Sequence, residues 1–105
     1  MRFKIREQLF AIERCLKKNQ CWQDLPPHPD LLQSTQPFCV DTLNLEQWLQ
    51  FILLPRLHTL LDEGRPLPRR IAITPYAEEA LKHSPKDNRD LLLLLSLFDQ
   101  SFNDD

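Results

Sequence analysis

The sequence contains very little glycine, since Gly64 is the only one among 105 residues. Sandwiches of β-strands and doubly wound α/β folds need many glycines in their turns, so this scarcity favours helices. It also excludes a glycine-rich phosphate-binding loop. The length is that of one domain, and we therefore expect a single helical domain over residues 1–105.

Long apolar runs and a targeting segment are missing as well. The longest apolar stretches, FILLP (51–55) and LLLLLSLF (91–98), are far shorter than the roughly 20 residues that span a bilayer. The first ten residues interleave charges with apolar residues, unlike a signal peptide. The three cysteines, Cys15, Cys21 and Cys39, form no CxxC pair. These features predict a cytoplasmic protein with reduced thiols and no membrane partner.

No arrangement of reactive residues in the sequence indicates catalysis. Cys39 stands between Phe38 and Val40, an apolar setting that disfavours a reactive thiolate, and no histidine has a recognisable spacing to it. The histidines and cysteines also lack the ligand spacing of a zinc site. We expect no catalytic residue, no cofactor and no metal.

Apolar residues at helical spacing predict four helices. In the first of them the apolar residues recur at steps of three and four and form one stripe. The predicted helices cover residues 3–19, 45–63, 75–83 and about 85–102. The expected fold is all-α, a compact antiparallel four-helix bundle.

The second predicted helix has the clearest boundary signals. Asn44 is a good N-cap, and Gln47 three residues later can complete a capping box. Leu43 and Trp48 have the spacing of a hydrophobic staple around this start. Gly64 suits the left-handed position that follows a helix C-terminus.

Two residues inside this helix depart from the expected pattern. Pro55 removes a backbone hydrogen bond to the Phe51 carbonyl and should kink the helix, at a cost of roughly 3 kcal/mol. Arg56 falls on the apolar face of a helical wheel, where an unpaired charge is costly. We therefore expect Arg56 to pair with an acid such as Asp41 or with nearby carbonyl groups. A ligand-binding role for Arg56 is the alternative.

The last two predicted helices begin with the same signal, an N-cap hydroxyl followed by proline. Thr74 and Pro75 start the third helix, and Ser84 and Pro85 start the fourth. In the fourth helix, two leucines point away from the apolar stripe. Those residues are Leu93 and Leu97. They are either covered or left as an apolar patch for a partner.

The connection 20–43 contains four prolines, which prevent a continuous helix. It also carries large apolar residues, too many for a disordered linker. These are Trp22, Leu25, Leu31, Leu32 and Phe38. We expect an ordered strap that lies on the helices. Near its end, Ser34, Cys39 and Asp41 stand close together. We interpret residues 34–50 as a clamp that fixes the strap to the helix, with Phe38 and Val40 pointing into the bundle.

Arg65, Arg69 and Arg70 form the densest basic cluster. This cluster is either a solvated surface or a contact for RNA phosphates. The net charge of −2 argues against non-specific nucleic-acid binding by the whole surface.

Several segments of the sequence resemble the YqcC family of small bacterial proteins. They are STQPFCVDTL (34–43), EQWLQFILLPRL (46–57), LP (67–68) and ITPYAEEAL (73–81). The resemblance implies a compact helical bundle. It also implies a genomic neighbour, because many gammaproteobacteria encode family members next to tRNA pseudouridine synthase C and some members carry that enzyme's name. Such synthases are large mixed α/β domains with a catalytic aspartate, whereas this chain is short and helical.

The residues that recur in the family carry over without an assigned catalytic role. They are Gln36, Pro37, Phe38, Asp41, Thr42, Trp48, Leu49, Pro55 and Arg56. The sequence and the resemblance together lead us to expect a non-catalytic adaptor, a monomer or weak homodimer, that acts with tRNA pseudouridine synthase C. The candidate partner- or ligand-binding residues are Gln36, Phe38, Asp41, Trp48, Arg56, Leu93 and Leu97.

Two alternatives to the adaptor remain open. One is direct tRNA binding through Arg65, Arg69 and Arg70 together with the basic first helix. The other is a small-molecule site or enzyme between strap and bundle. Its candidate residues are Arg56, His58, Cys39 and Asp41.

Overall fold

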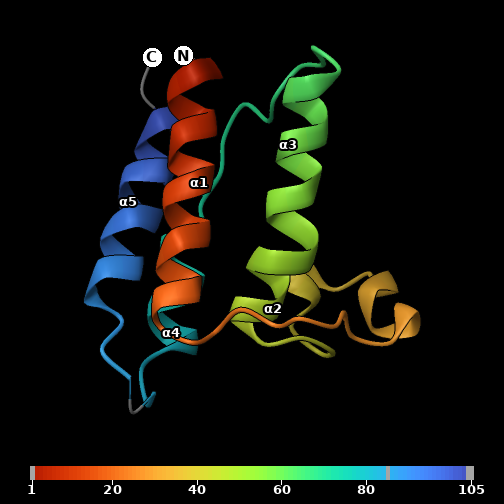
Figure 1. Ribbon diagram of the computed structural model, residues 1–105, viewed down its shortest axis with the longest axis vertical. Coiled ribbons are helices and arrows are strands. Elements are labelled where there is room, and N and C mark those ends of the chain that lie inside the picture. Colours follow the sequence, from red (N-terminus) through yellow and green to blue (C-terminus); the bar gives the residue numbers. More distant parts are fainter. Residues whose placement is uncertain (1, 85, 104–105) are drawn as a thin grey trace.

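Helices α1 (Arg2–Lys18) and α5 (Arg89–Asn103) run antiparallel, and α3 (Leu54–Asp62) packs against α1 from another side (Figure 1). This computed structural model describes residues 2–84 and 86–103. The short helix α4 (Thr74–Ala80) contacts α5. No β-strand occurs within the described residues, so the predicted all-α bundle with a strap between its first two helices is confirmed.

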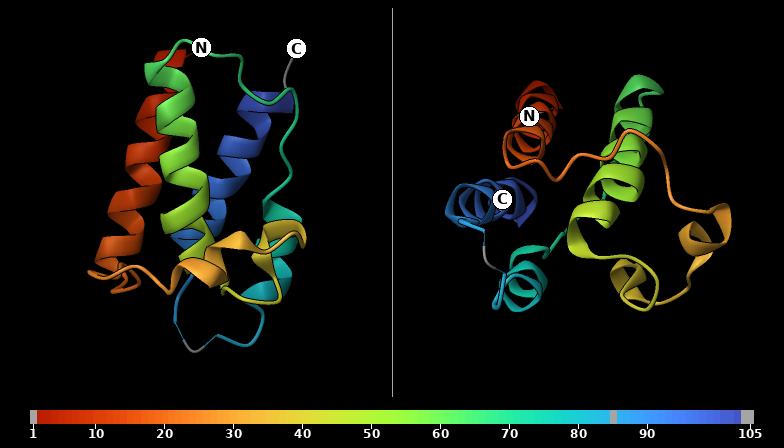
Figure 2. Two further views of the ribbon diagram at one scale, coloured as in Figure 1. Left: turned by 90° about the vertical axis from the view of Figure 1, so that its right-hand side faces the viewer. Right: turned by 60° about the horizontal axis from the view of Figure 1, so that its bottom comes forward.

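The strap and α4 lie at the same end of the bundle, as two views show (Figures 1 and 2). Within the strap, two short 3-10 turns, η1 (Pro29–Gln33) and η2 (Pro37–Cys39), replace regular helix. The connection 63–73 runs the other way, from the far end of α3 back along the bundle to α4 (Figure 1). Two irregular segments therefore flank the long central helix.

The core consists of the predicted apolar stripes. On α1, the side chains of Ile5, Leu9, Ile12 and Leu16 are fully buried, and on α5 Leu91, Leu95, Phe98 and Phe102 are buried too. Each such side chain contributes about 1.5–3 kcal/mol by leaving water. In the described part of the chain, no helix combines the length and apolarity that a membrane span requires.

The second predicted helix is continuous from residue 45 to residue 62. It consists of α2 (Leu45–Trp48), a π-helical segment η3 (Leu49–Leu53) and α3. The capping box between Asn44 and Gln47 is present at its start. At its end Gly64 has a φ of 65°, and the N–H of Arg65 donates to the Leu60 carbonyl over 2.9 Å. Both boundary predictions are thus confirmed.

The π-helical segment accommodates Pro55, which we predicted to kink the helix. The Leu54 N–H donates to the Leu49 carbonyl five residues back, so the turn before the proline is wider than an α-turn. The wide turn also shifts the helix face by one residue. Leu57 continues the buried row of Leu45 and Leu49, whereas Arg56 is exposed. The prediction that Arg56 lies in the same row as Leu45 and Leu49 is therefore wrong.

The starts of α4 and α5 differ from the sequence signals. Thr74 is the first helical residue rather than the N-cap, and its hydroxyl has no hydrogen-bond partner among the described residues. The cap comes from α5, because the Asp99 carboxylate accepts the N–H groups of Ile73 (3.1 Å) and Thr74 (2.8 Å). Helix α4 ends at Ala80 and not at residue 83.

Helix α5 begins at Arg89, four residues later than predicted. The predicted first residue, Pro85, lies outside the described residues. Asp87 accounts for the later start, because its carboxylate accepts the Arg89 N–H (3.1 Å) and pairs with the Arg89 guanidinium (2.8 Å). These bonds lower the pKa of Asp87 to about 2.

The strap packs only in part, contrary to the expectation that its large apolar residues lie on the helices. Leu25 is 79% exposed, and Val40, expected to point inward, is 55% exposed. Trp22 is half-buried, with the Lys17 ammonium 5.0 Å from its ring centroid. Hydrogen bonds hold the start of the strap, because the side chain of Gln50 donates to the Gln23 carbonyl (2.7 Å) and accepts the Gln23 N–H (2.9 Å).

Candidate functional site

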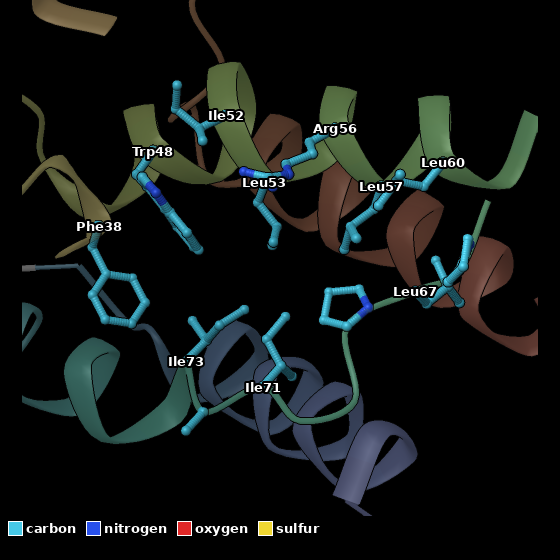
Figure 3. Close-up of a pocket in the computed structure, with 13 residues that line it drawn as sticks. Phe38, Trp48, Ile52, Leu53, Arg56, Leu57, Leu60, Leu67, Ile71 and Ile73 are labelled. Carbon is cyan, nitrogen blue, oxygen red and sulfur yellow. The ribbon is translucent and has the colours of Figure 1, made fainter. Parts of the chain in front are cut away.

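A cavity of about 580 Å³ lies between the helix 45–62 and the connection 63–73 (Figure 3). Trp48, Leu53 and Leu57 line it from the helix side, and Ile71 and Ile73 from the connection. Its volume is in the range of about 300–1,000 Å³ that is usual for binding pockets. We call it the strap cavity because the ring of Phe38, from the strap, forms one end of it.

An unusual backbone turn places Phe38 at the strap cavity. Phe38 and Cys39 have φ values of 58° and 51°, in the left-handed region that residues with a side chain disfavour. Such a conformation costs of order 1–3 kcal/mol per residue and persists only where surrounding contacts hold it. Here the contacts are aromatic. The Phe38 ring stacks on Tyr76 at 4.4 Å and meets Trp48 edge-on at 4.9 Å between centroids.

Tyr76 supports this aromatic cluster from α4. Burial is the main cause that raises the pKa of the Tyr76 phenol, and the charge of Glu46 adds to it. The phenol is therefore neutral at physiological pH, and the ring serves as an apolar wall behind Phe38. Residue spacing gives no signal for Tyr76, because its partner Phe38 is far away along the chain.

Arg56 is the one charged residue among the described residues that line the strap cavity. Figure 3 shows its side chain on the cavity side of the helix, alongside Leu53. It has no hydrogen bond or ion pair within the described residues. The expected pairing with Asp41 is wrong, because Asp41 instead accepts a hydrogen bond of 2.5 Å from the Ser34 hydroxyl.

The Ser34–Asp41 bond organises the end of the strap without forming a reactive centre. The Ser34 hydroxyl oxygen also accepts the Gln36 N–H at 3.1 Å, and Thr42 donates to the Leu31 carbonyl at 2.7 Å. Cys39 is buried beneath this turn. Gln36 and Asp41 are exposed and do not line the strap cavity. These contacts lie within the strap. Of the two residues predicted to point into the bundle, Phe38 contacts Trp48 and Tyr76, whereas Val40 is exposed.

The four residues of the predicted small-molecule or enzyme site are not brought together. Only Arg56 lines the strap cavity, whereas His58 faces α1, where its ring lies 5.1 Å from that of Phe10. Burial, and then the Arg6 guanidinium, lower the pKa of His58. No cluster of three or more potential metal ligands occurs in residues 2–84 and 86–103.

Leu93 and Leu97 are 59% and 45% exposed on α5, away from the strap cavity. Leu93 borders a smaller hollow of about 300 Å³ between α1 and α5. The basic cluster is exposed as well, along the connection 63–73, and Arg65 pairs with Glu63 at 2.9 Å. The sequence predicted each of these sets, and the structure places them on separate surfaces.

A third exposed apolar surface, between α1 and α3, was not predicted from the sequence. Phe3 is 77% exposed and, with Phe10 and Leu61, lines a hollow of about 660 Å³ between α1 and α3. Arg6 at this hollow is bound to Asp62 at 2.8 Å. A signal was available, because Phe3 and Phe10 are seven residues apart and share a face outside the Ile5 stripe.

These features define a small all-α bundle with a strapped end and an open apolar cavity. A family model described as "DUF446: tRNA pseudouridine synthase C" matches residues 4–101. The sequence is 41% identical over 102 residues to "Uncharacterized protein YqcC" of Escherichia coli K12, covering 97% of this chain and 94% of the relative. The chain belongs to the YqcC family.

A solved structure and a longer relative complete the comparison. The solution NMR structure of YqcC from E. coli matches with a TM-score of 0.83 at 42% identity, covering 99% of this chain and 89% of that one. A protein of Pectobacterium carotovorum named "tRNA pseudouridine synthase C" is 47% identical over 66 residues. This match covers 63% of our chain but only 18% of the relative.

Proposed function

We propose that the protein is a non-catalytic adaptor that acts with tRNA pseudouridine synthase C. The supporting observation is the Pectobacterium relative, in which a segment 47% identical to this chain makes up 18% of a longer protein with that name. Two parts joined in one polypeptide are held at a high effective concentration. As separate chains, the same two parts need an interface to stay together.

The distribution of reactive side chains also supports an adaptor. Cys39 is buried under the strap turn, His58 faces α1, and Asp41 bonds to Ser34. A nucleophile and a base must lie within hydrogen-bonding reach to act together. His58 lies on α3 and faces α1, whereas Cys39 and Asp41 lie in the strap, and Asp41 bonds to Ser34. The exposed apolar surfaces around Phe3, Leu93 and the strap cavity offer places for a partner instead.

The test is a binding measurement between purified components. The synthase from the same organism, titrated into this protein in a calorimeter, should give a saturable complex with a Kd in about the micromolar range or tighter. Tandem-affinity purification of this protein from its own cells should recover the synthase. If neither experiment detects the synthase while the protein is folded, the adaptor proposal fails.

Direct contact with tRNA is the second candidate. Arg65, Arg69 and Arg70 are all exposed on one connection, which supports phosphate contacts. In gel-shift titrations with tRNA, the triple change of these arginines to glutamine should weaken binding and flatten its salt dependence, because fewer counterions are released. The matched control changes Lys82, Lys86 and Arg89, which are exposed and lie outside both α1 and the connection 63–73, to glutamine. Equal loss in both triple variants would indicate non-specific attraction only.

A further inference from the structure

We propose that the strap cavity is the docking site for the synthase, and that it receives an apolar segment of that partner carrying one acidic side chain. The inference rests on the proposed adaptor function and adds to it the place and chemistry of the contact. Three properties of the cavity carry it: its apolar walls, its single cation and the fixed position of its aromatic end.

The walls of the strap cavity have the composition of an interface centre. Trp48 and Phe38 lie at one end, and Leu53, Leu57 and Ile71 continue the apolar lining. Aromatic and arginine side chains at the centre of an interface provide most of its binding energy. The cavity is not enclosed, so side chains of a partner can reach it from outside.

The charge at the strap cavity specifies what the apolar segment must carry. Arg56 is the one charged lining residue and has no ion pair within the described residues. An apolar segment that covered the guanidinium without an acceptor would leave a desolvated charge unpaired, which is costly. A carboxylate beside the apolar side chains removes this cost, because it can accept two parallel hydrogen bonds from arginine.

Contacts within the chain fix the position of the aromatic end. The left-handed conformations of Phe38 and Cys39 direct the Phe38 ring onto Tyr76 and Trp48. The Ser34–Asp41 bond holds the strap next to this turn. A preformed wall reduces the ordering cost of binding. The strain retained at Phe38 is thus consistent with a recognition surface.

The two other apolar hollows match an apolar segment with one carboxylate less well. At the Phe3–Phe10 hollow, Arg6 is already bound to Asp62 over 2.8 Å. At the hollow beside Leu93, Asp90 offsets only one of the two basic residues, but the volume is about 300 Å³ against about 580 Å³ for the strap cavity, and no aromatic ring lines it. The strap cavity is the better match for an apolar segment with one carboxylate.

Two changes in the strap cavity test the proposal against the purified synthase. Arg56→Glu reverses the lining charge, and Ala72→Trp places a large ring in the cavity from an exposed position on its edge. Each should weaken binding about ten-fold or more. The matched controls, Lys82→Glu and Ala80→Trp, alter exposed residues outside the cavity lining and should stay within about two-fold of the unchanged protein. Thermal melts establish that each variant folds.

The outcomes separate this inference from the adaptor proposal. If the unchanged protein binds and both cavity variants bind equally well, docking occurs elsewhere and the inference is overturned while the adaptor proposal stands. Parallel variants, Phe3→Ser and the pair Leu93→Ser with Leu97→Ser, then identify the surface used. If the unchanged protein does not bind, both fail together. Restored binding of Arg56→Glu by an acidic-to-lysine change in the synthase would establish the charge contact directly.

Discussion

Two buried polar side chains, Asp99 and Gln50, join segments that lie far apart in the sequence. Asp99 on α5 accepts the first N–H groups of α4, and Gln50 in the π-helical segment bonds to both backbone groups of Gln23. A helix start and a strap would otherwise leave backbone groups unsatisfied in partly buried places. The backbone groups of these segments therefore hydrogen-bond to two side chains instead of to other backbone groups.

Replacing Asp99 with alanine should destabilise the protein by about 2–3 kcal/mol, because two N–H groups lose a charged acceptor. Asp99→Asn should cost less, since its carbonyl oxygen still accepts one of them. Urea unfolding measures both values. The control is Gln100→Ala, the exposed neighbour on the same helix. An Asp99→Ala variant as stable as this control would contradict the role given to Asp99.

His58 should make stability depend on pH. Burial and the nearby Arg6 lower its pKa below the ordinary 6.5 in the folded protein. The unfolded chain therefore binds the proton more readily than the folded protein does. The free energy of unfolding should be highest above about pH 6.5 and should decrease as the pH falls toward the lower pKa of the folded state. Urea unfolding at several pH values should show a weaker dependence in His58→Gln. The exposed His83, changed to glutamine, should leave the dependence unchanged.

At the scale of elements, α1 and α3 end in the same hydrogen-bond arrangement with different residues. After α3, Gly64 adopts a φ of 65°, and after α1, Gln20 adopts a φ of 60°. At both helix ends, the backbone N–H of the following residue donates to the carbonyl of the residue five positions earlier. Arg65 donates to Leu60 (2.9 Å), and Cys21 donates to Leu16 (2.8 Å). The left-handed position suits glycine and disfavours glutamine.

Exchanging the residue at these two helix ends should shift stability in opposite directions. Gln20→Gly should stabilise the protein by about 1 kcal/mol, and Gly64→Ala should destabilise it by about the same amount. A Cβ at Gly64 would have no atom within 4 Å, so its cost comes from the backbone alone. Denaturant midpoints measure both. Shifts of the same sign in the two variants would rule out the backbone explanation.

Local signals in the sequence predicted these elements well where the partners are close along the chain. The capping box of Asn44 and Gln47 and the left-handed Gly64 each depend on residues close along the chain. Both ends of the long helix lie where these signals predicted them. The face of Arg56 could not be predicted, because the wheel assumed a regular α-helix and the π-helical segment adds a residue to one turn. Asp99 could not be predicted as the cap of α4, because this contact joins residues about 25 positions apart and local spacing gives no signal for it.

The sequence indicated three of the residues that line the strap cavity, and neither the cavity nor its other walls. Phe38, Trp48 and Arg56 were selected from the sequence, and all three line the strap cavity. The connection 63–73, which forms the opposite wall, was considered only for its arginines. Its apolar residues at the cavity lack helical or strand periodicity, so no pattern marked Leu67 or Ile71 as part of a site.

At the scale of the whole molecule, three long helices hold the core while the strap closes one end (Figure 2). Leu25 and much of the early strap are exposed, with few buried side chains to hold them. Native-state hydrogen exchange should therefore find fast exchange at residues 24–33 and slow exchange at buried positions of α1 and α5. The Gln23 amide should be slower than Asp24, because it donates to Gln50. Uniform protection would contradict this division.

The positions of the two tryptophans have an optical consequence. The indole of Trp22 lies near the Lys17 ammonium, whereas that of Trp48 forms part of the strap cavity beside the Phe38 ring. When only the tryptophans are excited, their fluorescence therefore comes from two different surroundings. With Trp22 changed to phenylalanine, the colour of the remaining emission would report on water at the strap cavity alone.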